Sequence, residues 1–328
     1  MTRVFSGIKP TGEATLGTLL GALRNFVDAQ GPEAVYCVVD LHALTFPQDP
    51  VELRRQTMAL ATLFLAVGID PEVATLFVQS HVHEHTELAW LMECTASVGE
   101  LRRMTQFKDK AGGEDSGKFV SGGLLTYPAL MAADILLYDT EEVPVGDDQR
   151  QHVELTRDVA ERFNARNGPT FTIPKAVTPK AGARVMDLQT PTRKMSKSED
   201  SPAGTISVLE DTAAVANKIK RAVTDTDNEV HFDPATKPGV SNLLSILAAA
   251  TGRTPEEAAR GYTQYGPLKS DTADAVVALL APIQQRHAVL SADPGEVARI
   301  LAAGAAKATE VAAATLARAH EAVGLLPR

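Results

Sequence analysis

The chain has 328 residues. A single hydrophobic core usually organises fewer residues than this, so we expect two domains. Hydrophobic residues make up 44% and charged residues 22% of it, which is ordinary for a globular enzyme. There are 32 Lys and Arg against 41 Asp and Glu, which gives a net charge of −9. This charge argues against a nonspecific nucleic-acid binder, whose affinity rests on neutralising phosphates, but it allows a local basic patch.

The cysteine count and the hydropathy pattern indicate the cellular compartment in which the protein works. Cys37 and Cys94 are too few for a disulfide framework or a multi-cysteine zinc site. No apolar run approaches the roughly 20 residues of a membrane span, and the first residues, MTRVFSGI, do not resemble a signal peptide. We therefore expect a cytoplasmic protein with no membrane partner.

The first half of the chain alternates β-rich runs with helical patterns. The expected strands are residues 3–8, 35–40 and 74–80, and the expected helices are residues 51–67 and a segment from about Leu16 that keeps the helical period. The run 35–40 is unbroken, which is typical of a parallel strand covered on both faces. Strands alternating with helices predict an α/β fold with a doubly wound parallel, Rossmann-like sheet.

The second half of the chain changes character. The composition changes over residues 110–123, and the first half of this segment, AGGEDSGK at 111–118, predicts a mobile loop. From about residue 206 helices dominate, and Thr254 and Asp293 each precede a proline and a glutamate at helix-start spacing. We expect a catalytic domain over residues 1–190 and a helical C-terminal region over 191–328.

One carboxylate lies inside an apolar stretch, residues 127–138, YPALMAADILLY, which we read as a helix opened by Pro128. Most Asp residues are caps or surface groups, but Asp134 lies nearly two turns past that proline, too far in for a cap. Burying it ionised costs several kcal/mol unless something pairs with it. Tyr127, Met131 and Asp134 share one stripe of the helix, and we interpret them as the wall of a pocket for an aromatic guest that carries a hydrogen-bond donor.

Two segments have residues suited to phosphate. The first expected strand runs into residues 9–18, KPTGEATLGT, where ligands of such a sheet bind. Thr15 and Thr18 flank Gly17 at a helix start, whose hydroxyls and N–H groups favour phosphate, although Thr in this position is more often a plain cap. The second segment, residues 193–200, RKMSKSED, offers lysines and serines for a polyphosphate; the alternative is a solvated loop.

In this order on an α/β chain, the two segments resemble the signatures of class I aminoacyl-tRNA synthetases. KMSKS at residues 194–198 matches the second signature at all five positions, and TLGT at 15–18 stands where the HIGH-like signature belongs. More closely, the chain resembles bacterial tryptophanyl-tRNA synthetases, a resemblance carried by residues 5–8, 104–108, 127–138, 143–149, 222–225 and 237–244.

This resemblance implies an enzyme that activates L-tryptophan with ATP and transfers it to tRNA(Trp), working as a homodimer whose helical region reads the anticodon. The implied tryptophan-binding residues are Phe5, Gly7, His42, Tyr127, Met131, Asp134, Val143, Val145 and Gln149. Among them Asp134 would accept the indole N–H, while Tyr127 and Gln149 would hold the α-amino group. A site built around a substrate N–H rejects an analogue that lacks it by as much as ~10⁴–10⁵-fold.

The resemblance also implies the residues that handle ATP. The implied catalytic residues are Lys194, Lys197, Lys110, Thr15 and Thr18, and the implied ATP-binding residues are Lys9, Gly17, Thr18, Gly146, Asp148, Met195, Ser196 and Lys197. Mg²⁺ is expected to arrive bound with ATP, with no metal held by the protein. The loop carrying Lys194 and Lys197 is expected to close over ATP as a lid.

Two departures from the family pattern keep alternatives open. Lys9 stands where the family generally has Gln, and Thr18 stands where Asn or His is usual. The alternatives are a specialised or regulatory paralogue of the same enzyme, a tyrosine-specific relative, or another nucleotidyltransferase on the same fold. We interpret His81, His83 and His85 as a polar strand end and not as a metal clamp.

Overall fold

The computed structural model describes residues 2–111, 119–177, 184–195 and 201–327. Its centre is a parallel sheet of five strands in the order β3-β2-β1-β4-β5. The strands are β1 Val4–Ile8, β2 Ala34–Val38, β3 Thr75–Val78, β4 Glu142–Pro144 and β5 Lys175–Val177. This confirms the expected parallel α/β sheet, and the order reverses at β1, where the chain passes from the β2 side to the β4 side.

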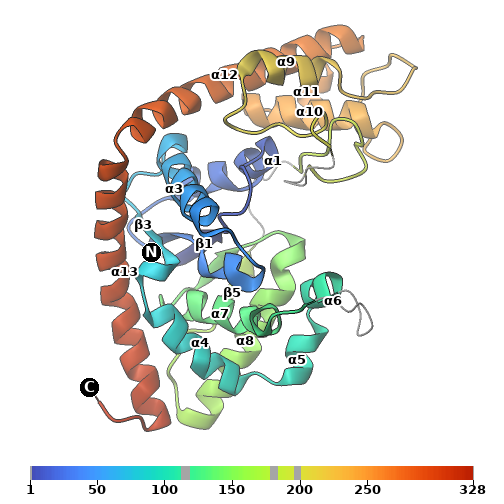
Figure 1. Ribbon diagram of the computed structural model, residues 1–328. Coiled ribbons are helices and arrows are strands. Elements are labelled where there is room, and N and C mark those ends of the chain that lie inside the picture. Colours follow the sequence, from blue (N-terminus) through green and yellow to red (C-terminus); the bar gives the residue numbers. More distant parts are fainter. Residues whose placement is uncertain (1, 112–118, 178–183, 196–200, 328) are drawn as a thin grey trace.

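Helices cover both faces of the sheet (Figure 1). In the first half they are α1 Leu16–Thr18, α2 Arg24–Ala29, α3 Pro50–Val67, α4 Glu84–Thr95, α5 Val98–Arg103, α6 Thr105–Ala111, α7 Gly122–Leu136 and α8 Asp147–Asn167, with a π turn at Leu19–Leu23 and 3₁₀ turns η2 at Leu41–Thr45 and η3 at Gln79–His81. In the second half they are α9 Thr212–Lys220, α10 Pro238–Thr251, α11 Pro255–Ala259, α12 Tyr265–Ala292 and α13 Pro294–Val323.

The period-two alternation of the strands divides the core into two layers. On β2, Tyr36 and Val38 belong to one buried cluster with α3 and the C-terminal helices, whereas Val35 and Cys37 belong to the other, with α4, α7 and α8. Since both faces of β2 are buried, its unbroken apolar run is explained.

The start of α7 differs from the sequence prediction. The helix begins at Gly122, where the Ser121 hydroxyl accepts a hydrogen bond from the Leu124 N–H at 3.1 Å, and Pro128 lies inside it. A proline within the first turns removes few helical hydrogen bonds, so the Ser121 cap decides where the helix starts. Of the loop expected at 111–118, Ala111 still belongs to α6, and residues 112–118 lie outside the described part of the chain.

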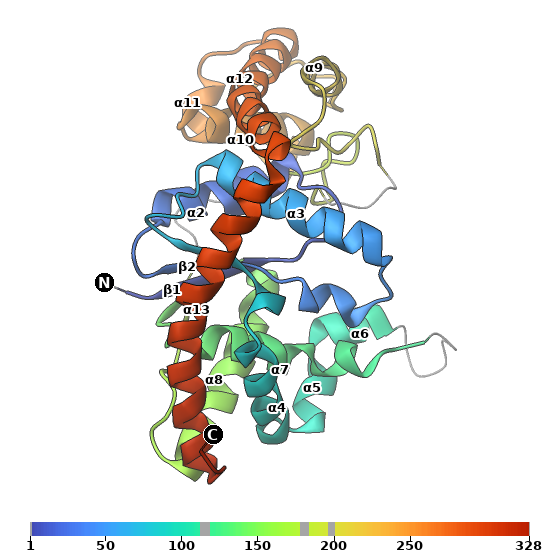
Figure 2. The same cartoon turned by 60° about the vertical axis from the view of Figure 1, so that its left-hand side comes forward.

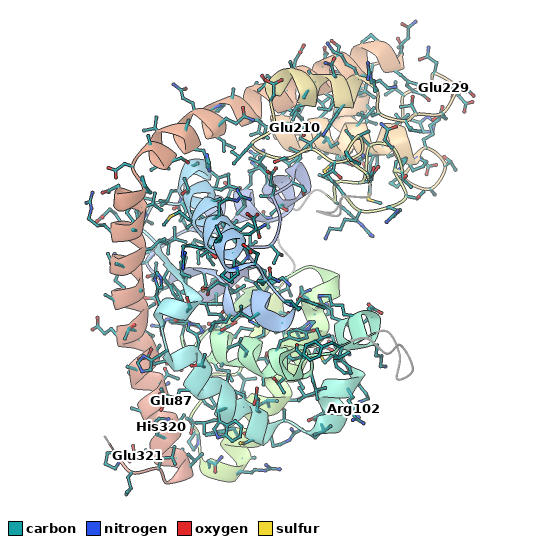
Figure 3. The ribbon with its side chains drawn as sticks, in the orientation of Figure 1. Glu87, Arg102, Glu210, Glu229, His320 and Glu321 are labelled. Atoms are coloured by element: carbon teal, nitrogen blue, oxygen red, sulfur yellow. The ribbon has the colours of Figure 1, made fainter. Side chains whose placement is uncertain are left out.

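The long helix α13 returns from the helical region along the sheet, at the left of Figure 1. It packs against β3 so closely that a Cβ on Gly304 would lie 1.8 Å from the Leu76 carbonyl oxygen. Further along, His320 faces Glu87 of α4 with an Nε2–Oε1 distance of 3.4 Å (Figure 3). By length and composition alone this helix is apolar enough to cross a membrane; in this structure one side of it packs along β3 and α4.

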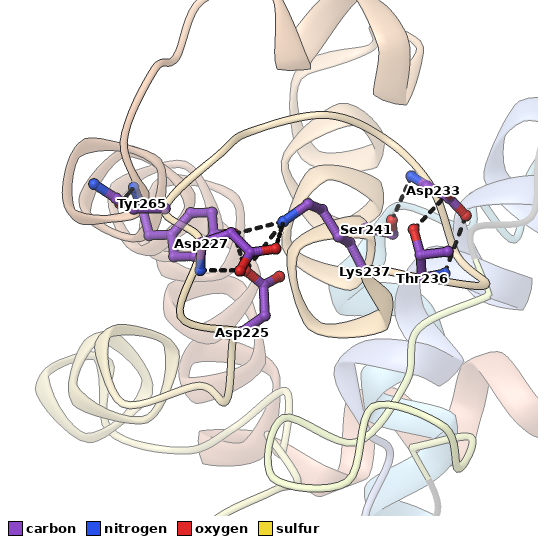
Figure 4. Close-up of polar contacts among 8 residues, drawn as sticks. Asp225, Asp227, Asp233, Thr236, Lys237, Ser241 and Tyr265 are labelled. Carbon is purple, nitrogen blue, oxygen red and sulfur yellow. Dashed lines mark hydrogen bonds and ion pairs between the residues drawn. The ribbon is translucent and has the colours of Figure 1, made fainter.

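The remaining helices form a separate layer above the sheet, best seen after the turn to Figure 2. The helices α9 and α10 pack on α12, and the C-terminal part of α12, which carries Arg286, packs on α3. A polar cluster around the buried Lys237 ties the segment before α10 to this layer (Figure 4). In it the Lys237 Nζ lies 3.1 Å from Asp225 Oδ1, 3.2 Å from Asp227 Oδ2 and 3.2 Å from the Tyr265 hydroxyl.

Candidate active site

The site lies on the face of the sheet that carries α4 and α7, at the strand where the order reverses. Ligands of doubly wound sheets bind at such a point, beyond the carboxyl ends of the strands. Gly7 is exposed although β1 is the central strand, and a Cβ there would lie 2.7 Å from Val39 Cγ1. Phe5 and Val143 lie buried in the core cluster on this face. An accessible central strand indicates open space above Gly7.

Asp134 of α7 lies beside this space. The residue is 1% exposed. It lies close to Cys37, because its negative charge raises the pKa of that thiol, second only to the effect of burial. Since Cys37 pairs in register with Gly7, Asp134 lies next to the central strand. Tyr138, one turn further along α7, stacks on Phe5 with ring centroids 5.7 Å apart.

The buried carboxylate is not stranded, because three side chains from other elements bind it. Oδ1 lies 2.6 Å from the Gln79 amide nitrogen and 2.7 Å from His85 Nδ1, and Oδ2 lies 2.8 Å from His42 Nε2. Burial alone would raise the pKa of Asp134, but the nearby His42 and His85 outweigh it and hold the pKa well below its usual value. The carboxylate is therefore ionised and held in place.

Two of these partners were missed or misjudged from the sequence. His85 is fully buried in the first turn of α4 and bonds both Asp134 and the Tyr138 hydroxyl, at 2.7 and 2.8 Å, so its interpretation as part of a polar strand end is wrong. The strand ends at Val78, and Gln79 follows at its carboxyl end, fully buried. The position of Gln79 directly after a strand was the signal that could have found it.

The stripe of α7 expected to line the pocket is present, since Tyr127, Met131 and Asp134 lie on one continuous helix. The Tyr127 hydroxyl lies 2.6 Å from His152 Nε2 on α8, the helix that also carries Gln149, and burial raises the pKa of Tyr127 to about 12. Its ring meets the His42 ring edge-on at 6.3 Å. Met131 and Val145 are partly buried against the same core cluster.

The first signature segment lies beside residues 193–195, the described part of the second. Thr15 caps α1 by accepting from the Thr18 N–H at 3.2 Å, and the two hydroxyl oxygens are 3.3 Å apart. The chain after the second segment pairs with the first, with Leu16 N–H donating to the Ile206 carbonyl at 2.8 Å. A Cβ on Gly17 would lie 3.8 Å from Met195, so the described part of the second segment lies beside the first.

The lysines are placed in part. Lys9 is half-buried, and its pKa is lowered first by burial and then by the charge of Lys110, whose Nζ lies 5.9 Å from the Phe46 ring centroid. Lys194 is exposed beside buried Met195. Gly146 is the N-cap residue of α8; the Asp148 side chain, Ser196 and Lys197 lie outside the described parts.

No group of three or more His, Cys, Asp or Glu side chains that could hold a metal ion occurs within the residues that the structure describes. Two accessible cavities border α13. One lies between β3 and α13 and is lined by residues that include Pro71 and Lys307. The other is lined mostly by polar and charged residues, among them Arg3 and Arg318. Neither contains any of the residues expected in the site, so the candidate site is defined by the Asp134 cluster and the paired signature segments.

Comparisons with known proteins agree with this geometry. Residues 1–281 match the family model of class I tRNA synthetases (W and Y), so the chain belongs to the class I aminoacyl-tRNA synthetases. It is 55% identical over 329 residues to tryptophan–tRNA ligase 1 of Streptomyces avermitilis, with 99% of both chains covered. Within the class it therefore belongs to the bacterial tryptophanyl-tRNA synthetases.

Solved structures give the same result. The tryptophanyl-tRNA synthetase of Mycoplasma pneumoniae matches with a TM-score of 0.91 and 37% identity, covering 99% of this chain and 98% of that one. The Campylobacter jejuni enzyme complexed with ADP and tryptophan matches with a TM-score of 0.82 and 32% identity, covering 99% and 100%. The Rossmann-like sheet with a helical C-terminal region is thus the fold of this family.

Proposed function

We propose that the protein is an ATP-dependent tryptophan–tRNA ligase, which forms tryptophanyl-adenylate and transfers the tryptophanyl group to tRNA(Trp). The observation that carries the choice of amino acid is Asp134. It is an ionised carboxylate, buried beside an accessible central strand, and three donors use three of its roughly four acceptor positions. One acceptor is left for a single donor, and the indole ring has one N–H.

The rest of the amino-acid pocket fits this guest. Phe5, Val143, Val145 and Met131 would pack the faces of the indole ring, and Gly7 leaves room for it. The Tyr127 oxygen keeps acceptor capacity beyond its contact with His152 and, with Gln149 on the facing helix, would bind the α-ammonium group. In this proposal phenylalanine leaves Asp134 without its last donor, and that is why it is rejected.

ATP would lie between the paired signature segments. Gly17 and Met195 would border the adenosine, with Gly146 and Asp148 at the start of α8 as further ATP contacts. After burial, the charge of Lys110 is the next cause that lowers the pKa of Lys9, and an anion between the two ammonium groups would relieve that repulsion. Lys9 and Lys110, with Thr15, Thr18 and Lys194, Ser196 and Lys197, are therefore proposed to contact phosphates.

The chemistry needs positioning and charge more than an acid or base. The tryptophan carboxylate attacks the α-phosphorus of ATP, the bond to pyrophosphate breaks, and a ribose hydroxyl of the tRNA terminus later takes the acyl group and releases AMP. Mg²⁺ bound with ATP supplies phosphate neutralisation. The residues of this chain orient the carboxylate toward the phosphorus and neutralise the leaving pyrophosphate through lysine side chains.

The assembly and the tRNA contacts extend the proposal. We propose a homodimer in which the catalytic domain of residues 1–190 takes the acceptor end of tRNA and the helical region of 191–328 takes the anticodon, in the cytoplasm and without a membrane partner. Trp90 and Val98 on neighbouring helices α4 and α5 are 64% and 59% exposed, as expected of a surface that a second copy covers. Light scattering at micromolar concentration should give twice the mass of the 34.9 kDa chain.

Amino-acid-dependent ATP–pyrophosphate exchange tests the function. Tryptophan should support exchange, whereas tyrosine and phenylalanine should be poorer by as much as ~10⁴–10⁵-fold in kcat/KM. Tyrosine deserves the comparison because its phenol also carries a donor. Exchange that prefers tyrosine would make the protein the tyrosine-specific relative; no exchange, with tryptophan still bound, would indicate a regulatory paralogue.

A further inference from the structure

We infer that His85 is a positioning residue for tryptophan selection: its Nδ1–H, held in place by Tyr138 from behind, fixes the Asp134 carboxylate so that one acceptor faces the indole N–H. This inference rests on the proposed function. It assigns a role to two fully buried residues that do not line the amino-acid pocket themselves.

The donor directions follow from the chemistry of the groups. An ionised carboxylate only accepts hydrogen bonds, so the His85 Nδ1 at 2.7 Å from Asp134 Oδ1 carries a hydrogen. The other ring nitrogen, Nε2, lies 2.8 Å from the Tyr138 hydroxyl, which can accept from it or donate to it. The result is a chain of hydrogen bonds from Tyr138 through His85 to Asp134.

The two carboxylate oxygens have different surroundings. Oδ1 is bound from the interior by Gln79 and His85, both without measurable exposure. Oδ2 is bound by His42, whose side chain keeps 11% exposure and whose ring meets Tyr127 of the pocket. Since Oδ1 is fully used, the remaining acceptor belongs to Oδ2, on the pocket side. Fixing Oδ1 fixes the rotation of the carboxylate and therefore the direction of that acceptor.

Gln79 and His85 are not equivalent in this task. The Gln79 amide also accepts from the Leu41 N–H at 3.1 Å, so its position is set by the backbone after β2. His85 has its ring packed against Phe77, with centroids 5.7 Å apart, and against Tyr138 at 5.6 Å. Packing and the hydrogen bond with Tyr138 thus fix the orientation of the imidazole. The oriented imidazole in turn fixes the position of the Asp134 carboxylate.

Two substitutions of His85 separate the hydrogen bond from the packing. In His85→Asn the amide nitrogen takes the place of Nδ1 and keeps the donor to Asp134. In His85→Gln the amide takes the place of Nε2, so the variant keeps contact with Tyr138 and loses the donor to Asp134. Both are polar amides in the same buried site. His81→Asn, the same substitution at an exposed histidine of the same segment, is the matched control.

The readout is the ratio of kcat/KM in pyrophosphate exchange for tryptophan and for 3-benzothienyl-alanine, whose sulfur replaces the indole N–H. The wild-type protein and His81→Asn should prefer tryptophan by about a hundredfold, and His85→Asn should stay within about threefold of that ratio. His85→Gln should fall below about tenfold. A general packing defect lowers both substrates together and leaves the ratio unchanged.

Each outcome decides the inference. Equal ratios in His85→Asn and His85→Gln, whether high or low, would overturn it. If His85→Gln does not fold, Tyr138→Phe replaces it, since the ring packing is kept and only the hydroxyl is lost; a fall in the ratio of at least about threefold supports the inference and an unchanged ratio overturns it. Asp134→Ala is the reference: if it keeps the wild-type ratio, or the wild type has no preference, the proposed function fails instead.

Discussion

Two polar clusters, one around the buried Asp134 and one around the buried Lys237, hold a charge in different ways. Lys237 has three N–H donors, and three oxygens surround it, from Asp225, Asp227 and Tyr265 (Figure 4). Asp134 is bound by two imidazoles and an amide, and one acceptor position remains. A charge whose hydrogen-bonding positions are all used within the chain is suited to a structural role. A charge with one unused position beside an open strand is suited to a ligand.

Removing the Asp134 carboxylate should have the largest effect on activity. Asp134→Ala should lower kcat/KM for tryptophan by about 10–150-fold, which corresponds to the roughly 1.5–3 kcal/mol of a hydrogen bond to a charged group. Pyrophosphate exchange measures it, at a temperature well below the melting point of the variant, because three buried donors lose their acceptor. Unchanged use of tryptophan, with phenylalanine still rejected, would refute the pocket.

Filling the open space should have a smaller effect. Gly7→Ala adds a methyl group 2.7 Å from Val39 Cγ1 on the pocket face, and the KM for tryptophan should rise by about tenfold with kcat changing less. Ser6→Ala is the control, because the neighbouring residue of a strand points to the opposite face. Should both variants have wild-type KM values, the space above Gly7 is not the amino-acid pocket.

Disrupting the Lys237 cluster should lower the stability of the protein and leave its activity unchanged. Lys237→Met leaves two carboxylates without their shared cation, and the melting temperature should fall by several degrees while the KM for tryptophan stays unchanged. Lys220→Met, at an exposed lysine of the same helical region, should melt close to the wild type. An altered tryptophan KM in Lys237→Met at full stability would show that the cluster has a role in the site.

The same cluster predicts a weak acid dependence of stability. Burial would raise the pKa of Asp225, but hydrogen bonds from Tyr265 and Lys237 outweigh it and lower the pKa to about 2. In the unfolded chain an Asp takes up its proton near pH 4, so this stabilisation is present above about pH 4 and is lost as the pH falls toward 2. Urea unfolding from pH 5 to 2.5 should show a shallower loss in Lys237→Met than in the wild type. Parallel curves would mean that Lys237 does not lower this pKa.

The sequence predicted the strands β1, β2 and β3, the helix α3 and the stripe of α7 because those features repeat with a period. Tyr127, Met131 and Asp134 could be placed together, since i, i+4 and i+7 share a helix face. The partners of Asp134 could not be predicted, because His42, Gln79 and His85 come from three different elements that only the tertiary fold brings together. The pattern of alternating histidines suggested a strand end, whereas a helix starts at Glu84 and buries one histidine of the three.

The roles of the lysines and hydroxyls remain predictions for a related reason. Thr15 and Thr18 bind each other as a helix cap in this structure, and either hydroxyl could still meet a phosphate. Lys9 departs from the family pattern, and a sequence pattern alone does not show what a lysine side chain contacts. Such contacts depend on the ligand, and only a measurement with ligand present can assign them.

The most direct test of the central claim is the proton spectrum of bound tryptophan labelled with ¹⁵N in the indole ring. The single tryptophan of the protein, Trp90, is unlabelled and does not contribute. In the wild type the indole N–H resonance should move downfield and exchange slowly with water, because a buried carboxylate accepts its hydrogen, and in Asp134→Ala both effects should disappear. A bound indole N–H with the same shift and the same exchange rate in both proteins would contradict the account.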